Sequence, residues 1–266
     1  MSQLLDHYGF THHPFGRLTP RAAVLRHRGF EEAFRRLRFT VDLDGLAVLI
    51  AEPGCGKSLL LAELADQLLA QPQWAVHYLA HTTTGPFGLI NVLARNLGLA
   101  PARSRSETAH ALAQKLLADE RHHLLVIDEA HALPDDSLED LRLLTIADFD
   151  RHSPFLLLLA GQPRLDERLQ EPIHRALDQR VTTLARLLPL GCEEIPAYLQ
   201  TRLAAAGVNQ PLFDDGAVRA LFDASDGVPR RLNTFATTAL IVAAARNQRR
   251  VSTQDVHDAV VDRGRP

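Results

Sequence analysis

The sequence predicts an α/β protein with a five-stranded parallel sheet between helices, followed by a small all-helical domain. Short, nearly continuous apolar runs alternate with helical patterns as far as about residue 190, which is typical of parallel strands buried on both faces. Beyond that point, helical patterns follow one another with no strand between them. The predicted strands are residues 46–50, 74–79, 124–128, 155–160 and 184–188, and the predicted C-terminal helices are residues 193–206, 214–224, 229–245 and 252–261.

These patterns divide the chain into three expected parts. Residues 1–42 form an N-terminal segment and a first helix that lead into the core, residues 43–190 form the α/β domain, and residues 191–266 form the helical domain. A chain of 266 residues buries roughly 70 to 75% of its unfolded surface when it folds. It therefore needs no disulfide or metal to be stable.

The composition of the chain limits the cellular compartments and the partners that we expect for the protein. Only two cysteines occur, Cys55 and Cys192, so a disulfide framework is not expected and a reducing cytoplasm is the natural location. No apolar run approaches the ~20 residues that cross a bilayer, and the N-terminus lacks a signal-peptide pattern, so we expect no membrane partner. The net charge of −3 means that any contact with nucleic acid must come from a local basic patch.

A phosphate-binding loop follows the first strand. Residues 51–58 read Ala-Glu-Pro-Gly-Cys-Gly-Lys-Ser and open into the helical pattern at 59–64. Glycines let the backbone turn so that successive N–H groups and a helix start converge on a phosphate, while Lys57 reaches the β and γ oxygens and Ser58 offers a hydroxyl to Mg²⁺. This Walker A pattern predicts a nucleoside triphosphate site made by Pro53, Gly54, Cys55, Gly56, Lys57, Ser58 and Leu59.

Two acids end the strand at 124–128, as a Walker B strand requires. Asp128 is expected to hold Mg²⁺, and Glu129 to orient and polarise the attacking water. Asp128 to His131 also spell a helicase tetrapeptide, but nothing else in the chain argues for helicase modules. We expect His131 to take a supporting or surface position.

An amide follows the fourth strand. The predicted strand 74–79 comes between the loop strand and the Walker B strand, an insertion that by analogy separates ATPases with a catalytic glutamate from kinases and GTPases. The run 155–160 then ends at Gln162, at the edge of the sheet between the two Walker strands. Gln162 is expected to hydrogen-bond the γ-phosphate and the water, a sensor-1 role; capping of the next helix is the alternative.

Two arginines are candidates for completing the site. Arg180 precedes the fifth strand, on the side of the domain away from its own loop, which suits an arginine finger for a neighbouring subunit; such a finger is worth ~10³ to 10⁵ in rate. Arg175 is close enough in sequence to take this role, and solvated arginines are the alternative. Arg230 opens a helix of the second domain as a sensor-2 candidate, and its neighbour Arg231 is expected to be solvated.

Together these motifs resemble the AAA+ ATPases, and finer details are similar to the ExeA-like family. The resemblance covers residues 5 to 262. The segments that carry it are Tyr8-Gly9-Phe10, Pro14-Phe15-Gly16, Leu25-Arg26-His27-Arg28, Asp128-Glu129-Ala130-His131, Gly161-Gln162-Pro163, Gln179-Arg180-Val181, Tyr198-Leu199-Gln200-Thr201-Arg202-Leu203 with Ala206-Gly207, and Gly227-Val228-Pro229-Arg230-Arg231-Leu232-Asn233. The family includes secretion ATPases of the ExeA type and mobile-element ATPases similar to TniB, TnsC, IstB and MuB.

The resemblance implies ATP and Mg²⁺ held between the α/β domain and a helical lid, at a subunit interface of a homo-oligomer. It also implies that the segment from Tyr8 to Phe15 packs near the adenine. Secretion ATPases continue past the lid into a membrane segment, whereas this sequence ends at Pro266, so we expect the mobile-element type.

The expected function is that of an ATP-dependent DNA-transposition helper. ATP binding would assemble a ring or helical filament on double-stranded DNA, which marks a target and recruits or activates a transposase, with a target-selection protein as a further partner; hydrolysis would disassemble it. The alternatives are a secretion or assembly ATPase that acts on proteins without DNA, and a nucleotide-dependent scaffold with vestigial hydrolysis.

DNA contacts are expected from one loop and its surroundings. Thr82, Thr83 and Thr84 follow the second strand and offer hydroxyls and backbone N–H groups to phosphates, and Arg103 and Arg105 add charge. An ordinary polar loop is the alternative. Phosphate contacts of this kind would give affinity without sequence preference and a strong dependence on salt.

Overall fold

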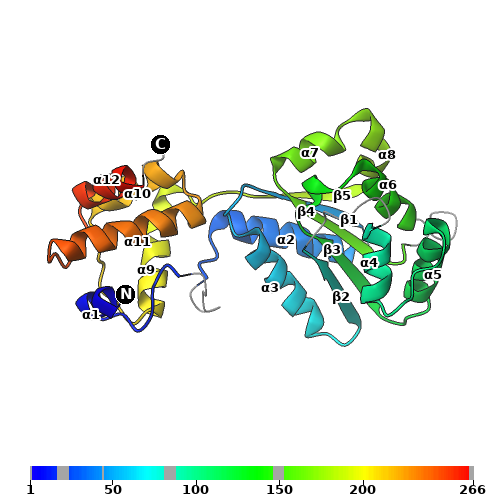
Figure 1. Ribbon diagram of the computed structural model, residues 1–266, viewed down its shortest axis with the longest axis horizontal. Helices are drawn as coiled ribbons and strands as arrows, with labels where there is room; N and C mark the ends of the chain where they lie inside the picture. The colour runs from blue at the N-terminus through cyan, green and yellow to red at the C-terminus, as the bar shows by residue number, and fades with distance from the viewer. Residues whose placement is uncertain (1, 17–23, 44, 81–87, 146–152, 264–266) are drawn as a thin grey trace. The chain divides into compact units, whose positions relative to one another are not determined.

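The computed structural model describes residues 2–16, 24–43, 45–80, 88–145 and 153–263. The chain divides into two compact units (Figure 1), an α/β unit of residues 32–187 and a helical unit of residues 1–31 with 188–266. The C-terminal boundary lies within three residues of the predicted one. The N-terminal segment differs from the expectation, because residues 1–31 group with the helical unit instead of leading separately into the α/β core.

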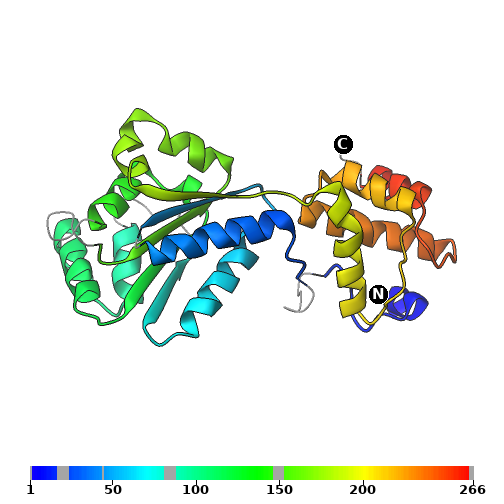
Figure 2. The same cartoon turned by 180° about the vertical axis from the view of Figure 1, so that it is seen from behind.

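The α/β unit contains a five-stranded parallel sheet in the order β2-β3-β4-β1-β5, which confirms the predicted sheet. Its strands are β1 (Leu46–Ala51), β2 (Trp74–Leu79), β3 (His122–Ile127), β4 (Leu156–Gly161) and β5 (Val181–Leu187). The edge strand β5 lies beside β1 (Figure 2). β4 lies between β1 and β3, the two Walker strands, as predicted for the run 155–160, while β2, which comes between them in sequence, is the opposite edge strand of the sheet.

Helices cover both faces of the sheet. Alternate residues of β1, β3 and β4 form one hydrophobic cluster with α4 to α8, while the other face packs against α2 and α3. The helices of this unit are α2 (Arg28–Asp42), α3 (Lys57–Leu69), α4 (Gly88–Asn96), α5 (Arg105–Leu117), α6 (Asp135–Leu144), α7 (Pro163–Leu169) and α8 (Arg175–Asp178), with single 3-10 turns η2 (Ala130–Ala132) and η4 (Pro172–His174). The first four residues of α2 belong to the helical unit.

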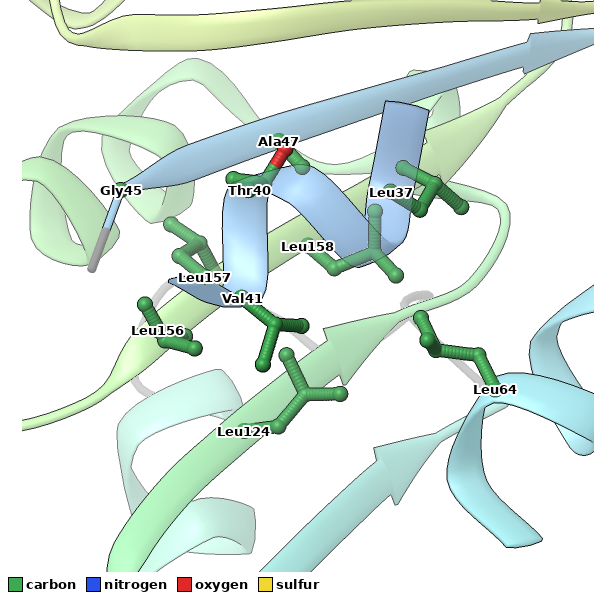
Figure 3. Close-up of a pocket in the computed structure, with 10 residues that line it drawn as sticks. All are labelled: Leu37, Thr40, Val41, Gly45, Ala47, Leu64, Leu124, Leu156, Leu157 and Leu158. Atoms are coloured by element: carbon green, nitrogen blue, oxygen red, sulfur yellow. The ribbon is translucent and has the colours of Figure 1, made fainter. Parts of the chain in front are cut away.

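A small cavity lies where α2 and α3 meet the sheet (Figure 3). Leu37 and Val41 of α2 and Leu64 of α3 line it, opposite Leu124 and Leu158 of the sheet. Its volume is about 10 Å³, close to the smallest space that holds one water molecule. The cavity is therefore a packing gap and not a ligand site.

The helical unit has its own core. Its helices are α1 (Ser2–Tyr8), α9 (Ile195–Ala205), α10 (Asp215–Ser225), α11 (Pro229–Ala245) and α12 (Thr253–Asp262), with a short turn η5 (Cys192–Glu194) before α9. Tyr8, Phe10 and Phe15 are buried in this core, and the buried Arg202 donates to the carbonyls of Pro14 (2.8 Å) and Gly16 (3.0 Å). These contacts explain why the N-terminal segment belongs to this unit.

In the part of the chain that the structure describes, every helix is too short or too polar to cross a lipid bilayer.

Candidate functional site

The loop between β1 and α3 has the backbone that an anion site requires. Gly54 and Gly56 have φ angles of 95° and 100°, a region that residues with a Cβ rarely adopt. A Cβ on Gly56 would meet no described atom within 4 Å, so conformation and not space demands glycine there. Among the described residues no side chain caps α3, which leaves its first N–H groups to bind an anion.

Lys57 is held by the two predicted acids. Its side chain is only 10% exposed, and its Nζ lies 2.6 Å from Asp128 Oδ1 and in ion-pair contact with Glu129 Oε1. A buried ammonium requires such partners because its desolvation is costly. The phosphate loop and the end of β3 are therefore joined by charge at the carboxyl edge of the sheet.

Asp128 collects hydrogen bonds from three segments. It accepts from the Tyr78 hydroxyl (2.8 Å), from the backbone N–H of Glu129 (2.8 Å) and, at 3.5 Å, from Ser58 Oγ. Burial raises the pKa of Asp128, but hydrogen bonds from Lys57 and Tyr78 outweigh it and lower the pKa overall. Asp128 is therefore ionised at neutral pH, as a ligand of Mg²⁺ must be.

Tyr78 is a site residue that the sequence analysis missed. It lies near the carboxyl end of β2 and pairs in register with Val126 of β3, which brings its hydroxyl to Asp128. Burial and the hydrogen bond to Asp128 raise the pKa of Tyr78. The signal available in the sequence was its position one residue before the end of a predicted strand.

Glu129 and Gln162 form a pair beside the loop. Gln162 follows β4, and its Nε2 donates to Glu129 Oε2 at 3.3 Å. Glu129 itself has a φ of 53°, a left-handed conformation that costs of order 1–3 kcal/mol outside glycine and is typical of functional sites. Gln162 precedes α7, but in the described structure its side chain makes no capping hydrogen bond, so the capping alternative is not observed.

His131 lies behind this pair. Its Nδ1 is 3.5 Å from the backbone N–H of Gln162, and its Nε2 is 3.7 Å from Glu129 Oε2. Burial lowers the pKa of His131. The residue is thus neutral near pH 7 and takes the supporting position that the sequence analysis expected.

The oxygen donors suit Mg²⁺. Mg²⁺ binds proteins through one or two oxygen ligands together with phosphates and water, and Ser58 Oγ and Asp128 Oδ2 lie 3.5 Å apart beside the loop. The described residues contain no cluster of three His, Cys, Asp or Glu side chains suited to a metal. Cys55 is buried in the loop, where burial raises the pKa of its thiol to about 11.

The arginine-finger candidate Arg180 lies at the opposite edge of the sheet. Val181, the first residue of β5, pairs with Leu46, the first residue of β1, whereas the phosphate loop follows the other end of β1. Arg180 immediately precedes Val181, and Arg175 is an exposed residue at the start of α8. Arg180 therefore lies away from the phosphate loop of its own chain.

The remaining predicted residues of the nucleotide site lie in the helical unit. Arg230 is exposed in the first turn of α11, while Arg231 forms an ion pair with Asp226. The Tyr8 hydroxyl donates to the carbonyl of Leu240 (3.2 Å), and the Phe15 ring packs in the core of this unit. Their proximity to a nucleotide remains a prediction.

Of the predicted DNA-contacting residues, only the two arginines are described. Thr82, Thr83 and Thr84 lie outside the described residues. Arg103 is exposed, but Arg105 donates to the Asp140 carboxylate (2.8 Å) and to the carbonyl of Asp136 (2.7 Å). The structure therefore gives Arg105 an internal role that the sequence analysis did not anticipate.

Comparison with known proteins matches the segment that contains this site to a domain family. Residues 41–169 match the model of the AAA domain, a stretch that contains the phosphate loop, both Walker acids and Gln162. The chain contains an AAA domain. It is also homologous to General secretion pathway protein A of Aeromonas hydrophila, with 31% identity over 233 residues that make up 85% of this chain and 42% of that protein. The chain thus spans less than half the length of this relative.

Solved structures share the AAA+ fold over most of this chain, beyond the matched AAA domain. Cdc6p from Pyrobaculum aerophilum superposes with a TM-score of 0.69 at 17% identity, over 92% of this chain and 69% of that one. The Aeropyrum pernix ORC1 protein in complex with DNA gives 0.62 at 18% identity (98% and 68%). The RuvB Holliday junction branch migration motor of Thermotoga maritima gives 0.59 at 18% (91% and 73%). At these identities the likeness concerns the fold alone.

Proposed function

We propose that the protein hydrolyses ATP, with Mg²⁺, at the site formed by the phosphate loop and the end of β3. The observation that carries the proposal is the pairing of Glu129 with Gln162 directly beside Lys57. Glycine loop, buried lysine, ionised aspartate and a part-exposed glutamate are the groups that phosphoryl transfer to water requires.

Each side chain then has a distinct role. Lys57 binds phosphate oxygens, and in doing so it exchanges its contact with Glu129 for the stronger charge of the phosphate. Ser58 and Asp128 hold Mg²⁺, which supplies charge neutralisation on the transferred group. Glu129, released from Lys57, accepts a proton from the attacking water that Gln162 helps to orient.

A second subunit completes the site in this proposal. Arg180 lies at the sheet edge away from its own loop, a position suited to a finger that enters the site of a neighbour, with Arg175 as the alternative. Arg230 of the helical unit approaches the γ-phosphate, and the segment from Tyr8 to Phe15 lies near the adenine. ATP therefore stabilises a homo-oligomer, a ring or a helical filament.

The assembly is proposed to form on double-stranded DNA and to recruit or activate a transposase, with hydrolysis as the disassembly step. Two of the similar solved structures are named as proteins bound to DNA, and the similar RuvB is named as a branch migration motor. These names support the proposal that the assembly forms on DNA. The threonine loop at 82–84 and Arg103 are the proposed phosphate contacts.

A protein-directed function is the second candidate. The similarity to General secretion pathway protein A extends over 85% of this chain, and it favours an assembly ATPase that acts on secretion components without DNA. Both candidates use the same hydrolytic site. They differ in whether duplex DNA binds.

Binding to a random DNA duplex separates the two candidates. We expect the protein with a non-hydrolysable ATP analogue to bind duplex at low salt, with log K falling linearly as log salt rises, and binding to weaken in ADP. Absence of duplex binding at low salt with the analogue bound would contradict the DNA proposal and favour the protein-directed function. Electron microscopy of the same mixture would report the oligomer and the DNA path.

A further inference from the structure

Arg168 of α7 binds the backbone of the turn that follows Glu129. Its side chain is 13% exposed, and one of its guanidinium nitrogens donates to the carbonyls of His131 (2.8 Å) and Leu133 (2.7 Å). A second nitrogen forms an ion pair with Asp135. One arginine thus holds both ends of the segment from 131 to 135.

The turn is also held by its own backbone bonds and by the burial of Ala130 and Leu133 in the hydrophobic cluster. Two backbone bonds close it, from the N–H of Ala132 to Glu129 and from the N–H of Leu133 to Ala130. Since Glu129 adopts a left-handed backbone conformation, the surrounding contacts must hold it there. Charge-assisted hydrogen bonds to carbonyls are among the strongest available for this purpose.

The same contacts continue into the segment that carries the finger candidates. Asp135 Oδ1 lies 3.0 Å from His174 Nε2, and the His174 side chain is 3% exposed. His174 directly precedes Arg175, the first residue of α8. Hydrogen bonds from Arg168 and His174 lower the pKa of Asp135, so this carboxylate stays charged at neutral pH and binds both.

We propose that Arg168 is a positioning residue that holds Glu129 in its catalytic geometry, and that Asp135 and His174 link this geometry to the finger-bearing segment at α8. The inference rests on the proposed ATPase function. In an oligomer, Arg175 or Arg180 of one subunit would contact the nucleotide site of its neighbour. Through the link, that contact would set the position of Glu129 in the first subunit's own site. The link needs only the bonds between α7, the 129–135 segment and His174, all within the α/β unit.

The test compares Arg168→Met with a matched control at Arg186 of β5, which pairs with the same helix. Arg186→Met removes an arginine that pairs with Asp166 of α7 and leaves the 129–135 segment untouched. We expect Arg168→Met to lower kcat about tenfold or more, a part of what a general base supplies, with KM for ATP within about twofold. Arg186→Met should keep both values. Equal kcat in Arg168→Met and wild type, or an equal loss in both variants, would overturn the proposal.

A combined variant asks whether Arg168 acts through Glu129. If it does, Arg168→Met added to Glu129→Gln lowers kcat no further than Glu129→Gln alone, because coupled residues are non-additive. A further loss, multiplied on top of Glu129→Gln, would overturn the positioning role. Full activity in Glu129→Gln itself would overturn the proposed function and this inference with it.

Two readouts guard against simple misfolding. Arg168→Lys keeps the charge but not the forked geometry, so we expect an intermediate kcat. Amide hydrogen exchange at residues 130–133 should be faster in Arg168→Met than in Arg186→Met, whether or not the protein hydrolyses ATP. His174→Ala tests the link, and we expect it to retain the wild-type kcat at saturating ATP and to lose cooperativity in the dependence of rate on ATP concentration. Unchanged exchange in Arg168→Met, or unchanged cooperativity in His174→Ala, would overturn the proposal.

Discussion

Lys57 and Asp128 form a buried ion pair, with 2.6 Å between Nζ and Oδ1 and neither side chain more than a tenth exposed. The two residues come from different elements, the start of α3 and the end of β3. Their attraction therefore joins the phosphate loop to the strand that ends at Asp128 and Glu129. Phosphate and Mg²⁺ would each compete for one member of this pair.

Removal of Lys57 should destabilise the nucleotide-free protein. In Lys57→Met the buried Asp128 carboxylate loses its charge partner, and breaking such a pair costs about 3–5 kcal/mol; because Tyr78 still donates to Asp128, we expect the lower end. Chemical denaturation measures the change. Lys115→Met is the matched control, since Lys115 is the second lysine of the chain and is exposed. The double variant Lys57→Met/Asp128→Asn should be more stable than Lys57→Met. A Lys57→Met protein as stable as the control would contradict the pairing.

The three tyrosines of the chain should resist ionisation in the folded state. Burial raises the pKa of Tyr8 to about 12, raises that of Tyr198, and, together with Asp128, raises that of Tyr78. Unfolded tyrosine ionises near pH ~10. Because the folded pKa values are higher, their stabilising contribution is fully present below pH ~10 and is lost as pH rises through the folded values. Absorbance at high pH should show no tyrosinate until unfolding begins; a reversible titration near pH 10 would contradict this.

The two arginines of the predicted DNA patch should behave differently. Arg103→Ala should reduce the salt dependence of duplex binding by about one ion, because each phosphate contact contributes a slope near 0.9. Arg105→Ala should instead destabilise the fold by about 2 kcal/mol or more, since Asp140 is buried and loses its partner. Duplex titrations at several salt concentrations and denaturation of both variants measure these effects. A pure binding defect in Arg105→Ala, with unchanged stability, would reverse this assignment.

Local pattern was enough to predict the strands and the residues at their ends. Apolar runs predicted all five strands to within a few residues, because a parallel strand buried on both faces must be apolar along its length. The loop at 51–58 and the acids Asp128 and Glu129 were predictable for the same local reason, since each lies in a continuous segment.

Features that depend on pairing between distant segments were not predictable in this way. The order of the strands arises from which edges pair, and it places β2 and β5 at the two edges of the sheet. Tyr78 reaches Asp128 through the β2–β3 register, and Arg105 meets Asp140 across 35 positions of sequence. Nothing in the sequence around Tyr8, Phe10 and Phe15 indicates that these side chains pack in the core of the helical unit.

The most direct test of the account is the rate of ATP hydrolysis in Glu129→Gln at saturating Mg²⁺ and ATP. The substitution keeps the shape of the side chain but removes its capacity to accept a proton. We expect the rate to fall by roughly 10²- to 10⁴-fold, the usual contribution of a general base, while affinity for a non-hydrolysable ATP analogue is unchanged and an ATP-bound oligomer accumulates. Hydrolysis at the wild-type rate in Glu129→Gln would contradict the account.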